Sequence, residues 1–165
     1  MTILPPRIIP FRRTMATIGT LQRITAERLS TLLLAEQAAA DPSVAVVDVR
    51  DDDYIGGHIK GCIHAPSRTL DAMMPTLMRR LEGKKTVVFH CALSQQRGPS
   101  AALRYLRERD QILASKGSSG DQAAPQPQTV YVLDRGFVSW QETYGTDERL
   151  TEGYSRELWK DGYWC

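Results

Sequence analysis

The segment that most constrains the fold of this chain is residues 86–99, because it joins a strand, a loop and a helix in immediate succession. Its sequence is Thr-Val-Val-Phe-His-Cys-Ala-Leu-Ser-Gln-Gln-Arg-Gly-Pro. The β-branched start predicts a short buried strand over residues 86–89, and Gly98 with Pro99 predicts the first turn of a helix. The loop between these two elements runs for seven residues, from Cys91 to Arg97.

A loop of this kind is suited to hold a tetrahedral oxyanion. Between a strand end and a helix start, amide N–H groups can converge on one point, and the positive end of the helix dipole adds to them. Cys91 is then the expected nucleophile, and Arg97 is expected to bind oxygens of the anion through its planar guanidinium. The expected oxyanion-binding loop consists of Ala92, Leu93, Ser94, Gln95 and Gln96. For Ser94, three roles stay open: a hydrogen bond to the thiolate, help in releasing a phosphocysteine, and shaping of the loop.

Short apolar strands alternate with helical patterns along the rest of the chain. Strands are predicted over residues 44–49 and 129–133, and helices over residues 25–40 and around Trp140 and Tyr144. Pro75 interrupts an apolar helical stripe, so we expect a short turn followed by a helix that starts near Pro75. The alternation implies an α/β fold, in which a parallel sheet is flanked by helices on both faces. Ligands bind at the carboxyl ends of such strands, which is where Cys91 falls.

The length of 165 residues is that of one domain. We predict a flexible or targeting tail at 1–19, a catalytic domain at 20–145 with a flexible insertion at 114–128, and an aromatic tail at 146–165 that packs on the domain. The N-terminal tail carries arginines and no acidic residue. This composition fits either a disordered basic tail or a mitochondrial transit peptide, and the early prolines favour the disordered tail.

Composition argues against several classes of partner. The net charge of +2 is too small to indicate nucleic-acid binding. No apolar stretch approaches the roughly 20 residues that span a bilayer, so no membrane association is expected. The three cysteines have no metal-like spacing, which argues against a zinc site and a disulfide framework. Free thiols indicate a reducing compartment, cytoplasmic or nuclear, with the mitochondrion as the alternative.

Two separated segments resemble the signatures of rhodanese domains. The first reads Val-Val-Asp-Val-Arg at 46–50, then Tyr54, Gly-His-Ile at 57–59, Gly61, Ala65 and Pro66, and the second covers residues 133–140. Within that family, His90-Cys91 with Arg97-Gly98-Pro99 is similar to the cell-division-cycle-twenty-five phosphatases and their small single-domain relatives, which include arsenate reductases. The resemblance covers residues 20–145 and implies the rhodanese-like three-layer fold.

The resemblance also implies an activity. It indicates a cysteine-dependent phosphatase of the protein tyrosine or dual-specificity type, which needs no cofactor, or an arsenate reductase that draws electrons from glutathione and glutaredoxin. The expected partner is a phosphate- or arsenate-type anion, which a phosphoprotein can carry. Rhodaneses that transfer sulfur are known for a loop one residue shorter, so the loop length disfavours sulfur transfer. A sulfurtransferase and a non-catalytic anion-binding module are kept as alternatives.

The loop departs from the cell-cycle phosphatases, because Ala92 and Gln96 stand where those enzymes carry acidic residues. The general acid therefore stays unassigned. His90 is expected to point away from the pocket and to organise the loop by hydrogen bonds. Asp48 is expected to be structural, with catalysis as the alternative. The other two thiols are interpreted as a packed core group at Cys62 and a candidate resolving thiol at Cys165.

Overall fold

The computed structural model describes residues 15–117 and 126–163. Its centre is a five-stranded sheet in the order β1-β6-β5-β2-β4, and every neighbouring pair is parallel. The strands are β1 (Gln22–Ile24), β2 (Val44–Asp48), β4 (Ile63–His64), β5 (Thr86–His90) and β6 (Thr129–Leu133). A small antiparallel pair joins β3 (His58–Ile59) to β7 (Thr151–Glu152). The predicted parallel sheet is confirmed.

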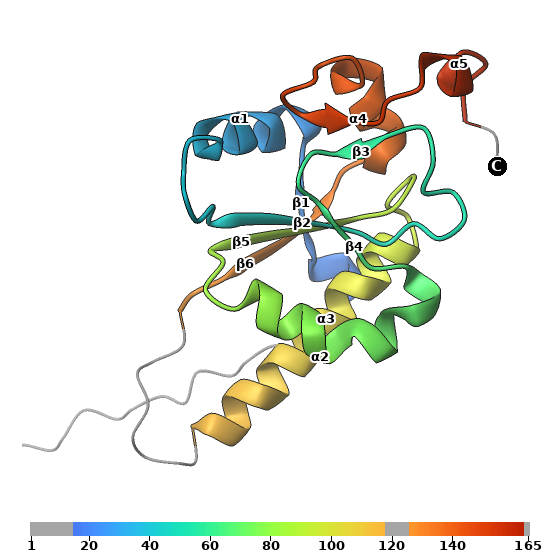
Figure 1. The fold of residues 1–165 in the computed structure, drawn as a ribbon. Helices are drawn as coiled ribbons and strands as arrows, with labels where there is room; N and C mark the ends of the chain where they lie inside the picture. Colours follow the sequence, from blue (N-terminus) through green and yellow to red (C-terminus); the bar gives the residue numbers. More distant parts are fainter. Residues whose placement is uncertain (1–14, 118–125, 164–165) are drawn as a thin grey trace, which may run out of the picture.

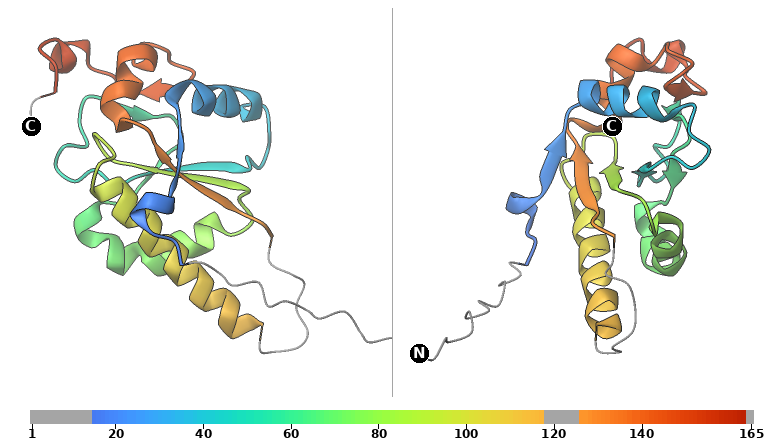
Figure 2. Two further views of the ribbon diagram at one scale, coloured as in Figure 1. Left: turned by 180° about the vertical axis from the view of Figure 1, so that it is seen from behind. Right: turned by 90° about the vertical axis from the view of Figure 1, so that its left-hand side faces the viewer.

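Helices cover both faces of this sheet, as predicted (Figure 1). On one face lie α1 (Ala26–Glu36), α4 (Gly136–Tyr144) and α5 (Arg156–Trp159), and on the other lie α2 (Leu70–Leu81) and α3 (Arg97–Lys116). Single turns of 3₁₀ helix stand at η1 (Ile18–Thr20) and η2 (Ser67–Thr69). The edge-on view separates the three layers (Figure 2). The rhodanese-like α/β architecture is therefore present.

Alternation along β5 divides its side chains between the two layers of helices. Val87 and Phe89 belong to the core under α2 and α3, whereas Val88 belongs to the core under α1 and α4. Neighbouring side chains in a strand point to opposite faces. His90 and Cys91, at the carboxyl end of this strand, accordingly lie on opposite sides, with Cys91 in the α2–α3 core and His90 beside Phe137 of α4.

The first helix is shorter than predicted, because α1 ends at Glu36 and not near residue 40. The carboxylate of Glu36 accepts hydrogen bonds from the hydroxyl of Ser43 and, at 2.9 Å, from the N–H of Val44. These bonds draw the start of β2 back to the end of the helix. The alanines in between therefore turn, although their helix propensity is high.

The expectation of a helix starting near Pro75 is wrong. Pro75 lies inside α2, which runs unbroken from Leu70. Proline lacks an N–H, so one backbone hydrogen bond is lost close to the start of the helix. Leu70, Met74, Leu77 and Leu81 are all buried in the α2–α3 core, and this apolar face outweighs the loss.

The structure describes only parts of the remaining predicted segments. Helix α3 continues to Lys116, so its end occupies the start of the predicted insertion, and Gln128 at the other end donates to the carbonyls of Leu81 and Lys84. Residues 1–14, 118–125 and Cys165 lie outside the described part of the chain. Near the C-terminus, the buried ring of Trp159 donates its N–H to the carbonyl of Gly56 at 2.8 Å.

Within 15–117 and 126–163, no helix has the length and apolarity needed to cross a membrane.

Candidate active site

Cys91 opens the predicted loop at the carboxyl end of β5, and its side chain is only 4% exposed. Its Sγ accepts a hydrogen bond from the N–H of Ser94 at 3.2 Å, and its own N–H donates to Oγ of Ser94 at 3.4 Å. Ser94 has a φ of 54°, in the left-handed region. The loop therefore closes on the thiol through the Ser94 backbone, while the Ser94 hydroxyl bonds the Cys91 amide and holds the turn.

Helix α4 fixes the outer side of this loop. The N–H of Phe137 donates to the carbonyl of Cys91, and the N–H of Val138 donates to the carbonyl of Ala92, both at 3.0 Å. In a trans peptide the carbonyl and the next N–H point in opposite directions. Two carbonyls held outward thus turn the N–H groups of Ala92 and Leu93 toward the inside of the loop.

This contact with α4 requires glycine at position 136. Gly136 has a φ of 58°, and a Cβ there would stand 2.4 Å from the carbonyl oxygen of Ala92 and 2.6 Å from that of Cys91. No other residue allows the helix to approach the loop so closely. The start of α4 therefore helps to shape the loop from Cys91 to Arg97, a role that the sequence reasoning did not assign to it.

Arg97 stands at the far end of the loop and is held by two carboxylates. Its Nη1 and Nη2 donate to Asp53 at 2.8 and 2.6 Å, and Nη1 also donates to Asp51 at 3.2 Å. The hydrogen bonds that Arg97 donates to Asp53, and then the charge of Asp53, raise the pKa of Arg97. These bonds occupy three of the five guanidinium N–H groups, which leaves donors for an anion.

Asp51 and Asp53 are site residues that the sequence reasoning missed. Arg97 lowers the pKa of Asp53 to about 2. Burial acts to raise the pKa of Asp51, but hydrogen bonds from Ser67, Arg68 and Arg97 outweigh burial and lower it. Both carboxylates are therefore ionised near neutral pH and serve as anchors for Arg97. A run of three aspartates after a strand was the available signal, but only the fold shows which of them face the loop.

A buried polar cluster lies on the opposite side of β5. Nε and Nη2 of Arg50 donate to the carboxylate of Asp48 at 3.1 and 2.8 Å, and Nη2 also donates to the carbonyl of Gly57 at 2.8 Å. The guanidinium of Arg50 lies 4.1 Å from the ring centroid of Phe137. No part of this cluster is exposed at Asp48, Arg50 or His90. Asp48 thus links β2 to the loop before β3 and does not face the thiol.

His90 connects this cluster to the loop. Its Nδ1 lies 3.0 Å from the carbonyl oxygen of Cys91, and its Nε2 lies 3.5 Å from Oδ2 of Asp48. Burial, and with it the charge of Arg50, lowers the pKa of His90 more than Asp48 raises it. The neutral ring carries its proton on Nδ1, because a carbonyl can only accept. His90 therefore braces the Cys91 peptide from the side away from the pocket.

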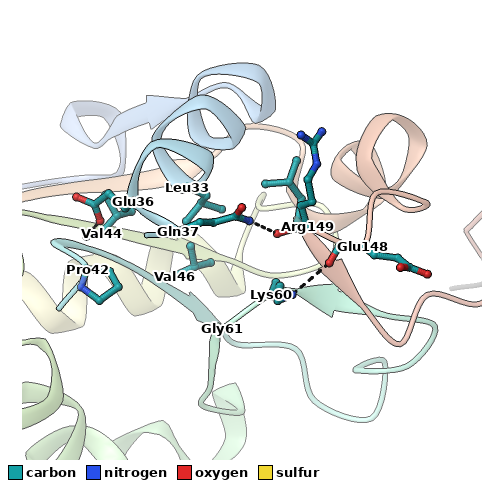
Figure 3. Close-up of a pocket in the computed structure, with 11 residues that line it drawn as sticks. Leu33, Glu36, Gln37, Pro42, Val44, Val46, Lys60, Gly61, Glu148 and Arg149 are labelled. Atoms are coloured by element: carbon teal, nitrogen blue, oxygen red, sulfur yellow. Dashed lines mark hydrogen bonds between the residues drawn. The ribbon is translucent and has the colours of Figure 1, made fainter. Parts of the chain in front are cut away.

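No other place in the described part of the chain combines a buried thiol, a loop of inward N–H groups and an arginine. A pocket of about 670 Å³ lies between α1, β2, Lys60 and the segment 148–150, and no residue of the Cys91 loop lines it. Figure 3 shows the residues that line this pocket. At its rim, Gln37 and Lys60 donate to the carbonyls of Arg149 and Glu148. No cluster of His, Cys, Asp and Glu suited to a metal occurs within the described ranges.

Comparisons with known proteins identify the family that this chain resembles. The family model of the rhodanese-like domain matches residues 31–143. The chain is 42% identical to the CDC25-like phosphatase YCH1 of Saccharomyces cerevisiae over 127 residues, which is 70% of this chain and 77% of that protein. It is 40% identical to Arsenate reductase 2.1 of Oryza sativa subsp. japonica over 114 residues, 68% of this chain and 66% of that protein.

A solved structure supports the same assignment. It is that of a yeast protein tyrosine phosphatase of the rhodanese family, 35% identical in sequence, with a TM-score of 0.68 over 84% of this chain and 96% of that chain. The parallel sheet, the Cys91 loop and the match of the family model across most of the sheet lead to one conclusion: the chain belongs to the rhodanese-like domain family.

Proposed function

We propose that this protein is a cysteine-dependent phosphatase that forms a phosphocysteine on Cys91. The observation that carries the proposal is the seven-residue loop from Cys91 to Arg97, in which the buried thiol accepts the N–H of Ser94 and the arginine is held at the opposite end. The named relatives include phosphatases of the same family, which supports this reading. The substrate is a phosphate monoester, free or on a phosphoprotein.

In the proposed reaction the Cys91 thiolate attacks phosphorus, and the bond from phosphorus to the leaving oxygen breaks. The inward N–H groups of the loop and the donors left on Arg97 stabilise charge on the three equatorial oxygens. Asp53 and Asp51 hold the guanidinium of Arg97 in place, so that its remaining donors can bind these oxygens. Water then attacks the phosphocysteine, which releases phosphate and regenerates the thiol.

Proton supply to the leaving group comes from the substrate or from water in this proposal. The loop itself has no carboxyl group, since Ala92 and Gln96 stand at the relevant places. Asp51 and Asp53 both have lowered pKa values and are engaged with Arg97. Aryl phosphates, whose leaving groups need little protonation, should accordingly be better substrates than alkyl phosphates.

Arsenate reduction is a second candidate, favoured by the similarity to a plant arsenate reductase. Arsenate is a tetrahedral oxyanion like phosphate, and the same thiolate can form a bond to arsenic as hydroxide or water leaves. Reduction to arsenite takes two electrons, which Cys91 and a second thiol supply as the bond from sulfur to arsenic breaks and the two sulfurs join in a disulfide. We propose glutathione with glutaredoxin as the thiol donors.

One experiment compares three reactions on one preparation: hydrolysis of p-nitrophenyl phosphate, arsenite production with arsenate and glutathione, and thiocyanate production from thiosulfate and cyanide. We expect the first to proceed and to be lost in Cys91→Ser but kept in the matched variant Cys62→Ser. A Cys91→Ser protein as active as the parent would contradict the proposal. Dominant thiocyanate production would instead identify a sulfurtransferase, and no turnover with ordinary thiol reactivity would identify a binding module.

A further inference from the structure

We propose that Arg23 is a positioning residue for the anion-binding loop, acting through the carbonyl of Ser94 to aim the N–H of Gln95 at the anion. This inference rests on the proposed function of the loop. Arg23 lies on β1, at the edge of the sheet, and precedes the residues that the family model matches. It is joined to the loop across 71 residues of sequence.

The contact is specific in its geometry. Nη1 and Nη2 of Arg23 each lie 3.2 Å from the carbonyl oxygen of Ser94, so both arms of the guanidinium donate to one acceptor. Asp134, at the end of β6, lies 3.8 Å from Nη1 of the same guanidinium. Arg23 is therefore held between the end of β6 and the loop, with its side chain 43% exposed.

The orientation of one peptide group follows from this contact. No peptide bond in the described residues is cis, so the carbonyl of Ser94 and the N–H of Gln95 point in opposite directions. Because Arg23 holds that carbonyl on the β1 side, the N–H of Gln95 is turned away from β1. Within the described residues, the N–H groups of Leu93, Gln95 and Gln96 donate no hydrogen bond to another part of the protein.

Arg23 completes a set of three carbonyl anchors around the loop. The carbonyls of Cys91 and Ala92 are held by backbone N–H groups of α4, as described above. The third carbonyl belongs to Ser94, which has a φ of 54°. This left-handed conformation is costly for a residue other than glycine. At Ser94 a side chain, and not the backbone of a helix, supplies the anchor, so a substitution can remove it.

The test compares Arg23→Met with Arg23→Lys and with the control Arg28→Met. Arg28 lies on α1 over the ring of Tyr131 and makes no contact with the loop, so its loss removes the same charge nearby. The readouts are kcat and KM for p-nitrophenyl phosphate, and the concentration of inorganic vanadate that halves the rate of Cys91 alkylation by iodoacetamide. Melting temperatures confirm that each variant is folded.

For Arg23→Met we expect kcat/KM to fall about tenfold, mostly through kcat, and the protecting vanadate concentration to rise about tenfold. Arg23→Lys, with one donor restored, should recover part of both. Arg28→Met should match the parent within about twofold. Both readouts unchanged in folded Arg23→Met, or an equal loss in Arg28→Met, would overturn the inference.

The parent protein separates failure of this inference from failure of the proposed function. If the parent binds vanadate without hydrolysing the ester, the proposed function fails, while the alkylation readout still decides the role of Arg23. If vanadate does not protect Cys91 of the parent from alkylation, both the proposed function and the inference fail.

Discussion

Two thiols of this protein, Cys91 and Cys62, lie on the same scaffold in opposite environments. Cys91 is surrounded by peptide N–H groups, one of which donates to its sulfur, and it precedes the start of α3. Cys62 has the hydroxyl of Tyr54 at 3.9 Å, and its burial, with the charge of Asp48, raises its pKa to about 12. Cys91 is the more buried of the two side chains, so burial does not explain why it should be the more reactive.

The difference indicates why Cys91, and not Cys62, is the nucleophile in the proposed reaction: of these two thiols, Cys91 is the one that lies among oriented dipoles. Three groups create the orientation at Cys91: the backbone of α4, the guanidinium of Arg97, and the turn at Ser94. Cys62 has no counterpart to any of them among the described residues, and Asp48 adds a charge that opposes a thiolate. This difference can be tested by comparing the two thiols directly and by altering one group at a time.

The largest expected effect is the difference in alkylation rate between the two thiols. At pH 7, iodoacetamide should modify Cys91 at least about 100-fold faster than Cys62, because the thiolate is the reactive form. Peptide mass spectrometry of partly labelled protein measures both sites in one sample. Inorganic vanadate should slow the labelling of Cys91 and leave that of Cys62 unchanged. Equal rates at the two sites would show that the loop does not activate its thiol.

Replacing the planar guanidinium of Arg97 should give the next largest effect. Arg97→Lys keeps the charge but loses the planar pair of donors, so kcat/KM for p-nitrophenyl phosphate should fall by about 100-fold. The matched control is Arg104→Lys on α3, which alters exposed ion pairs with Asp71 of α2 and Glu108 of α3. Activity should be kept in the control. If Arg97→Lys retains activity, charge alone suffices, and the bonds to Asp53 lose their proposed purpose.

Gly136→Ala tests the contact between α4 and the loop. The new Cβ would collide with the carbonyls of Ala92 and Cys91, so we expect a loss of about 1–3 kcal/mol in unfolding free energy and about a tenfold loss of kcat. Gly153→Ala is the control, because Gly153 has a similar φ of 64° and nothing within 4 Å of its Cβ position. Urea unfolding and steady-state kinetics measure both. Equal effects in the two variants would assign the loss to backbone strain, not to the loop.

The smallest effect concerns Cys62 and appears only in alkali. Its pKa is raised from the ordinary value of 9.0 to about 12, so above pH 9 the unfolded chain releases this proton while the folded chain keeps it. Stability should therefore fall as the pH rises from 9 toward 12. In Cys62→Ala that fall should be shallower, with the part due to Tyr54 remaining, since burial also raises the pKa of Tyr54. The measurement is the melting temperature of the parent and of Cys62→Ala at each pH in this range. If the melting temperatures of both fall equally with pH, the effect is not due to Cys62.

The sequence was sufficient to predict the parts of the site that are contiguous in the chain. The strand, the cysteine, the arginine and the start of α3 follow one another within a few residues, and local pattern indicates them directly. Asp53 and Arg23 could not be predicted in this way. They reach the loop across 44 and 71 residues, and their contacts depend on the order of the strands in the sheet.

The same limit explains the wrong boundaries. Pro75 indicates a helix start by local rules, but the packing of the α2 face on the sheet keeps the helix continuous. The alanines after Glu36 favour helix, but a carboxylate bonded to the start of β2 ends it. In both places a tertiary contact overrides the local preference.

The central claim is that the Cys91 sulfur receives the phosphoryl group. Rapid acid quenching during turnover of p-nitrophenyl phosphate, followed by peptide mass spectrometry, tests it most directly. We predict one phosphoryl group on the peptide that contains Cys91, none on the peptide that contains Cys62, and none at either site in Cys91→Ser. Steady hydrolysis without any phosphoryl group on Cys91, or with one on Cys62, would contradict the account.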